Sequence, residues 1–389
     1  MSKKVCHITT VHPPFDTRIF YKECRTLSQN GYDVTLIAQH DRDEIVDGIK
    51  IVPLPKVRSR LQRFLGLDIL AFWKAMKQRA YIYHFHDPEL IPWMLMLKLI
   101  SKSKVVYDMH EYYSEVIIDR SRWLRKFSFL KGILKIFLEY LPSSFFDLIV
   151  FPTFSLEKEI KLSSRSLTLI NLPSLQDVSI ISEISIPWNQ KKYDIIHVGT
   201  ISPSRMRFML EVARYLDLDM VKFKWLFVGV SKDTIRWTLK NYDNKFIERH
   251  FILLGKIPYV EVFKYLRDSR IGFNYHPFEK RFLVSIPMKI FEYMMAGLPV
   301  VTTELPELKR LLGDESVIFI RAQQPQDYAL ALLKLLKNPT EATRIGSMSR
   351  DLIFNKLNWE LSERDKLLNA YKNLLIRREL YEQKINNKC

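Results

Sequence analysis

The sequence lacks several features that identify common protein classes. Its three cysteines, Cys6, Cys24 and Cys389, have neither metal-binding nor redox spacing. There is no G-x-G-x-x-G motif, so a nicotinamide-binding site is not supported. No apolar run reaches the roughly 18 residues of a membrane-spanning helix. The N-terminus lacks the apolar core and small-residue cleavage site of a signal peptide, so we expect a protein of the reducing cytoplasm.

Basic residues are in excess, and the formal net charge is +17. The sequence has no basic recognition helix, zinc spacing or RNP-like aromatic motif, so we expect no nucleic-acid partner. Two stretches, 56–104 and 120–141, mix Lys and Arg with Trp, Phe, Leu and Ile. This composition suits the headgroup layer of an anionic membrane and predicts peripheral attachment at the inner face of the cytoplasmic membrane. Ordinary helices with inward aromatics and solvated lysines are the alternative.

The length of 389 residues and the apolar content of 47% predict two well-packed domains. A strand at 4–9, a helix ending at Asn30-Gly31 and a strand at 32–39 read as a βαβ unit, and the same alternation restarts at Tyr193. This pattern predicts α/β domains with parallel sheets and right-handed crossovers. We predict domains at 1–184 and 185–372, with a helix at about 373–389 that packs back on the first domain.

Polar residues follow the predicted strands of the first domain, in HFHDPEL at 84–90 and DMHEYYSE at 108–115. Ligands of open parallel sheets bind beyond the carboxyl ends of the strands, so these loops are expected to line a cleft. His86 and Asp87 could orient an acceptor hydroxyl or could stabilise their loop. Asp16 and Arg18 could shape an acceptor loop or could form an internal ion pair.

The stretch Val284 to Glu307 predicts a helix followed by a buried strand. We expect Ser285 to cap the helix, Pro287 to lie in its first turn and Gly297 to end it in a left-handed conformation after about three turns. Ser285, Lys289 and Glu292 would then share one face. A helix N-terminus with a lysine suits a phosphate, and a glutamate suits sugar hydroxyls. A solvated helix with a weak surface ion pair is the alternative.

Arg205 follows the predicted strand end at Gly199 and is the second cation expected at a diphosphate. Its planar guanidinium suits phosphate oxygens better than an ammonium does. A structural salt bridge remains the other reading.

Four motifs in order carry a family resemblance: HPPFDTRIFYKE at 12–23, HFHDPEL, YDMHEYYSE and the pattern P-x-K-x-F-E-Y-M-x-x-G-x-P-V-V at 287–301. Together they resemble the group 1, family-4 retaining glycosyltransferases over nearly the whole chain. The resemblance implies an α/β protein of the GT-B fold, with two facing Rossmann-like domains, parallel sheets and an interdomain cleft. It also implies transfer from a nucleotide diphosphate sugar to a lipid-linked glycan acceptor, as in bacterial polysaccharide, O-antigen or capsule assembly.

The same resemblance assigns roles to particular residues. Glu292 matches the second glutamate of the E-x7-E motif, which holds the donor ribose, and Arg205 matches the basic residue that binds the diphosphate. Lys289 matches a phosphate or donor-sugar contact, and His110 matches the histidine that touches the transferred sugar. These four are the expected catalytic residues. The other expected donor contacts are Gly199, Thr200, Gly255, Lys256, Ile257, Ser285 and Pro287; the expected acceptor-side residues are Asp16, Arg18, His86, Asp87 and Glu111.

Two positions depart from the family pattern. The first glutamate of E-x7-E would fall at Val284, and the usual Gly-Arg pair of the phosphate loop is Gly199-Thr200 here. We expect Lys289 and Arg205 to compensate on the phosphate side, and we expect no cofactor and no metal. A non-catalytic binding or scaffold protein on the same fold is the main alternative, and an epimerase or a phosphorylase is a third. The donor base, sugar, acceptor and linkage stay open.

Overall fold

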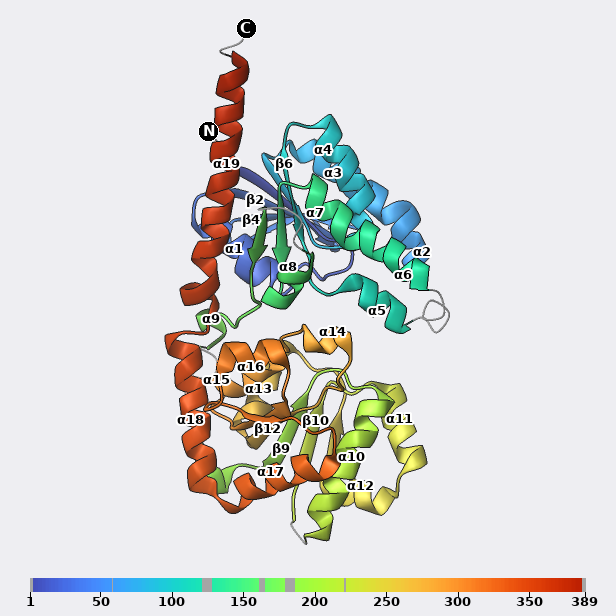
Figure 1. Cartoon of the computed structure of the whole chain (residues 1–389), viewed down its shortest axis with the longest axis vertical. Helices are drawn as coiled ribbons and strands as arrows, with labels where there is room; N and C mark the ends of the chain where they lie inside the picture. The colour runs from blue at the N-terminus through green and yellow to red at the C-terminus, as the bar shows by residue number, and fades with distance from the viewer. Residues whose placement is uncertain are drawn as a thin grey trace. The chain divides into compact units, whose positions relative to one another are not determined.

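The computed structural model describes residues 3–57, 59–120, 128–160, 165–178, 186–219 and 222–386. The chain forms two compact units, unit 1 with residues 1–171 and 362–389 and unit 2 with residues 172–361 (Figure 1). The first boundary between the units therefore lies at 171/172. The predicted boundary, 184/185, lies outside the described residues. The chain returns to unit 1 at Ser362, earlier than the predicted position of about 373. Hydrogen bonds fix the two crossings. Trp359 N donates to Pro173 O at 2.8 Å in unit 2, whereas Ile170 N donates to Glu363 Oε2 at 3.0 Å in unit 1.

Unit 1 contains an eight-stranded sheet in the order β3-β4-β2-β1-β5-β6-β7-β8. All neighbouring strands pair in parallel except β3 and β4, which form an antiparallel edge. The strands are β1 (Lys4–Ile8), β2 (Asp33–Gln39), β3 (Glu44–Val46), β4 (Ile49–Leu54), β5 (Ile82–Phe85), β6 (Lys104–Asp108), β7 (Leu148–Phe151) and β8 (Ser166–Thr168).

The helices of unit 1 cover its sheet and include the end of the chain. A π-helical turn at Ile19–Cys24 leads into α1, and another at Ile136–Tyr140 joins α6 to α7. The helices are α1 (Arg25–Gln29), α2 (Arg60–Gln62), α3 (Asp68–Gln78), α4 (Ile91–Ile100), α5 (Tyr113–Arg120), α6 (Ser128–Lys135), α7 (Leu141–Phe145), α8 (Phe154–Ile160) and α19 (Arg364–Asn386).

Unit 2 contains a second parallel sheet, of six strands in the order β11-β10-β9-β12-β13-β14. Its strands are β9 (Tyr193–Val198), β10 (Trp225–Val228), β11 (Phe251–Leu254), β12 (Ser269–Asn274), β13 (Val300–Thr303) and β14 (Ile318–Ile320). Its helices are α9 (Leu175–Val178), α10 (Pro203–Leu218), α11 (Lys232–Asn241), α12 (Asn244–His250), α13 (Tyr259–Arg267), α14 (Lys280–Leu283), α15 (Met288–Met295), α16 (Pro306–Leu312), α17 (Pro325–Lys337) and α18 (Pro339–Asn355).

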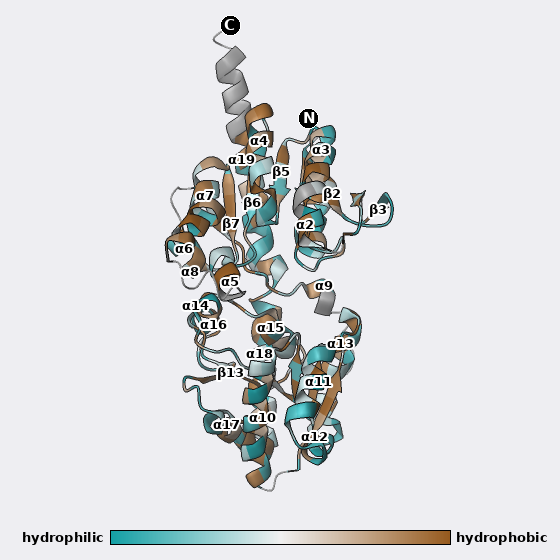
Figure 2. Ribbon diagram, turned by 90° about the vertical axis from the view of Figure 1, so that its right-hand side faces the viewer, coloured by the Kyte–Doolittle hydropathy of each residue, from teal (hydrophilic) through white to brown (hydrophobic). Residues whose placement is uncertain are grey.

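The central strands are buried on both faces, as helices on each side of a parallel sheet require. All four residues of β5, β7, β10 and β13 are buried, and Figure 2 colours β7 brown for its hydrophobic side chains. Helix α10 shows how the sequence sets a covering helix. Ser202 caps it, Pro203 lies in its first turn, and its buried residues recur at helical spacing from Met206 to Leu216.

Helix α15 corrects one expectation. It spans eight residues, about two turns, and its N-cap is Pro287 without a side-chain cap bond. Ser285 lies outside the helix, and its hydroxyl donates to Phe282 O at 2.9 Å, so it neither caps α15 nor shares a helical face with Lys289. Pro287 has an extended ψ of 118°, which delays the start of the helix to Met288. Gly297 has φ of +68° and ends the helix as predicted.

Within the described parts of the chain, none of the helices combines the length and apolarity needed to span a bilayer.

Candidate functional site

Two glycines bring the loops after β9 and β10 together. Gly199 has φ of +102° and Gly229 has φ of +93°, conformations that L side chains rarely adopt. A Cβ on Gly229 would lie 3.2 Å from the Cα of Gly199, and Gly199 N donates to Val228 O at 2.8 Å. On its other side, Gly199 faces Lys289, whose Nζ lies 3.1 Å from where a Cβ of Gly199 would be. The loop after β9 therefore presents backbone without a side chain to Lys289 of α15.

Arg205 lies over the same loop. Its backbone N–H donates to the Ser202 hydroxyl that caps α10, and its Nη2 donates to Thr200 O at 2.6 Å. Burial, and next the guanidinium of Arg281, lower the pKa of Arg205. Among the residues that the structure describes, no salt bridge of Arg205 is found, although one was its alternative interpretation; the side chain lies near another cation instead.

Lys289 is half-buried and completes the cationic cluster. Burial, and next the positive charge of Arg205, lower the pKa of Lys289 to about 7, while Glu292 acts in the opposite direction. Within the described residues, its ammonium makes no hydrogen bond or ion pair. Cations placed this close repel each other unless an anion lies between them. The arrangement of Gly199, Arg205 and Lys289 suits a diphosphate.

Glu292 lies one turn beyond Lys289 on α15, with 9% of its surface exposed. The next residue, Tyr293, fixes the helix to the sheet. Its hydroxyl accepts from Val198 N at 2.8 Å, and its ring fills space that a side chain at Gly272 would occupy, since a Cβ there would lie 2.5 Å from the ring. The tyrosine of the F-E-Y-M pattern therefore positions Lys289 and Glu292 against the carboxyl end of β9.

Two buried histidines that were not among the predicted site residues face this cluster. His197, on β9, donates from Nδ1 to Phe273 O at 3.1 Å. His276 follows β12, and neither of its ring nitrogens has a hydrogen-bond partner within the described chain. Burial, and next Lys289, lower the pKa of both histidines well below the usual value. The one sequence signal was a histidine inside the apolar strand YDIIHV; nothing local marked His276 as buried.

The other residues predicted on the donor side follow β11 at the same sheet edge. Gly255, Lys256 and Ile257 follow β11, and Gly255 O accepts from Gly229 N at 3.1 Å. Gly255 and Lys256 are exposed. Strand β10 separates β11 from β9, so this segment lies about 10 Å from the Gly199 loop across the sheet.

In unit 1, histidines gather at the carboxyl ends of β1, β5 and β6. His7 Nδ1 lies 3.1 Å from His86 Nε2, and His86 Nδ1 lies 3.2 Å from Asp108 Oδ2 and 3.1 Å from His110 Nε2. Asp108 Oδ2 also lies 3.1 Å from His110 Nε2. Of these residues only His110 retains exposed side chain, at 13%, so it is the end of the chain of histidines that a ligand can reach.

Tyr371 of α19 closes the buried end of the histidine chain. Its hydroxyl lies 2.6 Å from His84 Nδ1 and 3.3 Å from His7 Nε2. Nε2 of His84 has no partner among the described residues, so it carries the lone pair, because an unpaired N–H would cost more. His84 Nδ1–H then donates to the Tyr371 hydroxyl, which donates to His7 Nε2. His7 Nδ1–H donates in turn to His86 Nε2, and His86 Nδ1–H donates to Asp108 Oδ2. Burial lowers the pKa of His86 to about 4, which keeps this residue neutral.

Arg18 and Asp16 have structural roles in unit 1. Arg18 is 3% exposed and donates to both carboxylate oxygens of Asp108 at 2.9 Å and to Leu169 O. Although burial acts to raise the pKa of Asp108, Arg18 and next His110 hold it well below the usual value. Asp16 accepts from the backbone N–H groups of Arg18 and Ile19. An ion pair between the two side chains, which was one of the two readings, is not found among the described residues; Arg18 pairs with Asp108 and Glu23 instead.

His86 and Asp87 are buried as well. Asp87 Oδ2 accepts from Thr9 Oγ1 at 2.8 Å and from Thr10 N at 2.6 Å, so it ties the β5 loop to the β1 loop. Asp87 thus stabilises its loop, which was one of the two readings, whereas the His86 ring bonds to His7 on β1 and Asp108 on β6. Glu111 is exposed at the same edge as His110.

The atoms of His86, Asp108 and His110 lie close enough to hold a metal ion. Both oxygens of Asp108 are already bonded to Arg18, however, and His86 is bonded to His7. Hydrogen bonds thus account for the cluster without an ion.

Comparison with known proteins bears on the family and the fold. Sequence models of two families match the chain, "Glycosyltransferase Family 4" at residues 17–164 and "Glycosyl transferases group 1" at residues 192–338. No curated protein matches it.

Solved structures share the fold across nearly the full length. Sucrose-phosphate synthase from Thermosynechococcus elongatus is 15% identical, with a TM-score of 0.68, and the match covers 99% of this chain and 100% of that one. A glycosyltransferase from Rickettsia africae is 13% identical, with a TM-score of 0.68 and coverage of 96% and 99%. HepE from Anabaena, in complex with UDP and glucose, is 11% identical, with a TM-score of 0.64 and coverage of 97% and 99%. The two Rossmann-like units have the GT-B fold.

Proposed function

We propose, since this chain belongs to the group 1, family-4 glycosyltransferases, that it transfers a sugar with retention of configuration from a nucleotide diphosphate sugar to a lipid-linked glycan acceptor. A role in bacterial surface-polysaccharide assembly follows from the same proposal. The carrying observation is the convergence of the Gly199 loop, Arg205, Lys289 and Glu292 at one edge of the unit 2 sheet.

The chemistry follows from where charge develops. As the glycosidic C–O bond loosens, negative charge accumulates on the departing diphosphate, so cations and backbone N–H groups placed there lower the barrier. Arg205 and Lys289 supply the two cations, and the uncapped first turn of α15 supplies N–H groups. In this proposal, Glu292 accepts hydrogen bonds from ribose hydroxyls. In a retaining reaction, the diphosphate takes the proton of the incoming hydroxyl.

We further propose that transfer needs no metal, because the protein's own cations neutralise the diphosphate. Two Asp-x-Asp sequences occur, one in unit 1 and one at the opposite edge of the unit 2 sheet from the Gly199 loop. Asp41 and Asp43 follow β2 in unit 1, and Asp41 pairs with Lys56 at 2.7 Å. Asp217 and Asp219 lie at the C-terminal end of α10, which leads to the amino end of β10, and Asp217 bonds to His250.

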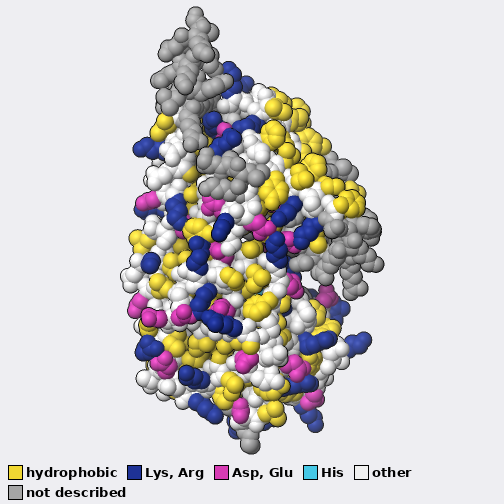
Figure 3. All heavy atoms as spheres, viewed as in Figure 1, with side chains coloured by type: hydrophobic (Ala, Val, Ile, Leu, Met, Phe, Trp, Pro, Cys, Tyr) yellow, Lys and Arg dark blue, Asp and Glu magenta, His cyan; other side chains and the backbone are white. Residues whose placement is uncertain are grey.

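Attachment to an anionic membrane is part of the proposal and rests on α6 and the turn after it. Phe129, Ile133, Ile136 and Phe137 recur at helical spacing and are 43–63% exposed. Figure 3 shows hydrophobic side chains gathered over the part of unit 1 where Figure 1 draws α4, α7 and α6. The lysines of α6 lie at the flanks, where Lys131 and Lys135 pair with Glu115 and Glu159. An outward apolar face with flanking lysines suits insertion at the headgroup boundary.

The test is transfer from a panel of UDP-, GDP- and ADP-sugars to lipid-linked acceptors by the full chain. The double variant Arg205→Ala with Glu292→Ala should lose transfer while keeping its fold. The matched control is Arg207→Ala, because the Arg207 guanidinium instead lies 5.8 Å from the Trp237 ring. Wild-type transfer by the double variant would end the proposal.

The non-catalytic alternative rests on Val284, which replaces the first glutamate of E-x7-E. A donor-binding enzyme gains thermal stability with nucleoside diphosphate by mass action, whereas a scaffold need not. A protein that shows neither a saturable shift nor transfer would be such a scaffold.

A further inference from the structure

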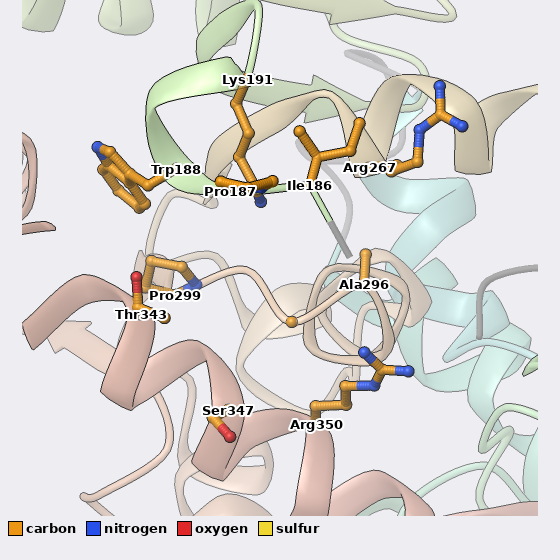
Figure 4. Close-up of a pocket in the computed structure, with 11 residues that line it drawn as sticks. Ile186, Pro187, Trp188, Lys191, Arg267, Ala296, Pro299, Thr343, Ser347 and Arg350 are labelled. Atoms are coloured by element: carbon orange, nitrogen blue, oxygen red, sulfur yellow. The ribbon is translucent and has the colours of Figure 1, made fainter. Parts of the chain in front are cut away.

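A pocket of ≈ 260 Å³ opens in unit 2 away from the candidate donor site. Trp188 and Lys191 line it from the segment before β9, Pro299 from the segment before β13, and Ser347 and Arg350 from α18 (Figure 4). The end of α15, at Ala296 and Gly297, forms part of its wall.

The pocket lies at the amino edge of the sheet. Lys191 precedes β9 and Pro299 precedes β13, whereas Gly199 follows β9 at the carboxyl edge. The six residues of β9 rise by about 20 Å between these edges. A small ligand in this pocket would therefore not overlap a diphosphate at Gly199, Arg205 and Lys289.

Two cations line opposite walls of the pocket. Figure 4 shows Lys191 extending into it from one rim and Arg350 approaching from α18, while Arg267 turns its guanidinium away. Lys191 Nζ donates to Ser269 O at 2.8 Å. Arg350 lies over the Phe354 ring at 5.1 Å and, among the residues that the structure describes, has no acidic partner. Arg267 is paired with Asp268. The interior thus has an excess of positive charge that suits a phosphate.

The other walls suit hydroxyl groups and a ring. Helix α15 ends at Met295, whose carbonyl would need an N–H at position 299, where proline has none. The carbonyls of Glu292, Tyr293 and Met294 already accept backbone N–H groups, so only the Met295 carbonyl lacks its helical donor. The Ser347 hydroxyl on α18 adds a donor and an acceptor to the pocket wall. The Trp188 indole supplies an apolar wall of the kind on which a pyranose ring packs.

We propose that this pocket is a second ligand site, which binds a phosphorylated monosaccharide with its phosphate on Lys191 and Arg350. The inference depends on charge, hydroxyl acceptors and an aromatic wall at one place, and it does not require the proposed transfer reaction. The pocket, with a volume of ≈ 260 Å³, has room for a ligand the size of one sugar ring.

The experiment is isothermal titration of the full chain with glucose 6-phosphate, inorganic phosphate and glucose as separate probes at constant ionic strength. Wild-type protein should bind glucose 6-phosphate saturably, with at least about tenfold preference over the other two probes. Arg350→Ala should weaken binding by at least about tenfold. Since loss of Arg350 also removes packing on Phe354, Ser347→Trp is the second variant, because it fills the pocket and leaves every charge in place. The matched control is Arg344→Ala on the same helix, whose guanidinium pairs with Glu341.

Saturating UDP should leave glucose 6-phosphate binding unchanged, which separates this site from the donor site. Competition by UDP, equal affinity for inorganic phosphate, or undiminished binding by both Arg350→Ala and Ser347→Trp would overturn the proposal. Weakened binding in Arg344→Ala to the same extent would also overturn it, since that result would indicate non-specific charge attraction.

Discussion

The ammonium of Lys289 lies against the backbone of Gly199, 3.1 Å from the point where a side chain would begin. The two residues are 90 positions apart, on α15 and at the end of β9. Because Gly199 has φ of +102° and no side chain, its loop leaves room for the lysine and for a phosphate beside it. This contact links the two halves of the candidate donor site.

Gly199→Ala should therefore weaken nucleoside diphosphate binding. The new Cβ would push the Lys289 ammonium back by a few tenths of an ångström. Alanine at this φ adds about 1–3 kcal/mol of backbone strain. We expect UDP or GDP affinity to fall at least about tenfold in calorimetric titration. Gly313→Ala is the matched control, because Gly313 also has positive φ, +69°, but a Cβ there meets nothing within 4 Å. Gly313→Ala should lose some stability and keep full affinity for the nucleoside diphosphate. Equal losses of affinity in both variants would contradict a role for the contact between Gly199 and Lys289.

Lys289 should make donor binding depend on pH. Its pKa is lowered to about 7, mainly by burial and next by Arg205, so it loses its proton as pH rises above 7. An anion binds the protonated form, so nucleoside diphosphate affinity should fall from pH 7 to 9, by up to about tenfold per unit. In Lys289→Arg the side chain stays charged over this range, so the nucleoside diphosphate affinity should change little between pH 7 and 9. Identical pH profiles for the two proteins would count against the role of Lys289.

Tyr371→Phe tests the histidine chain of unit 1. The hydroxyl joins His84 and His7, and its loss leaves buried ring nitrogens without a partner. We expect the free energy of unfolding to fall by about 1–3 kcal/mol in urea denaturation. Tyr32→Phe serves as the control, since the Tyr32 ring packs edge-on against Tyr371 at 5.9 Å and its hydroxyl donates to none of the described residues. If Tyr371→Phe leaves the free energy of unfolding unchanged, the hydroxyl contributes little to stability.

The exposed face of α6 should bind anionic lipid. Ile133→Glu with Phe137→Glu places two negative charges on an apolar surface that Figure 2 colours brown at α6. We expect the variant to stay in the supernatant when vesicles rich in phosphatidylglycerol are sedimented, while the wild type pellets with them. Leu218→Glu in unit 2 is the control, because Leu218 is 77% exposed on a different helix. Pelleting of both variants alike would exclude α6 as the anchor.

Much of the fold could be predicted locally. The strands at 33–39, 104–108 and 193–198 and the helix after Ser202 follow from apolar runs, capping residues and glycine stops, which act over a few positions. The prediction that Ser285 caps α15 was wrong because it used only this local pattern. A serine three residues before a helix satisfies the local pattern of a cap, but its hydroxyl bonds back to Phe282, which the pattern does not contain.

The residues of the candidate site likewise fall into those that a local pattern predicted and those that only the structure revealed. The P-x-K-x-F-E-Y-M pattern placed Lys289 and Glu292 on one helix, but no pattern indicated that His197 and His276 would face the lysine from other strands. Nor could the sequence decide between exposure and burial for Arg18, His86 and Asp87. Asp87 is buried because it bonds to Thr9, 78 positions away.

The sequence alone determined the family, the alternation of strands and helices and the residue types that suit a diphosphate, because these depend on neighbours in the chain. Only the tertiary structure decided where the chain divides, which cations meet, and which polar groups are withdrawn from solvent. Those outcomes depend on hydrogen bonds and charges between strands that are adjacent in the sheet and distant in sequence.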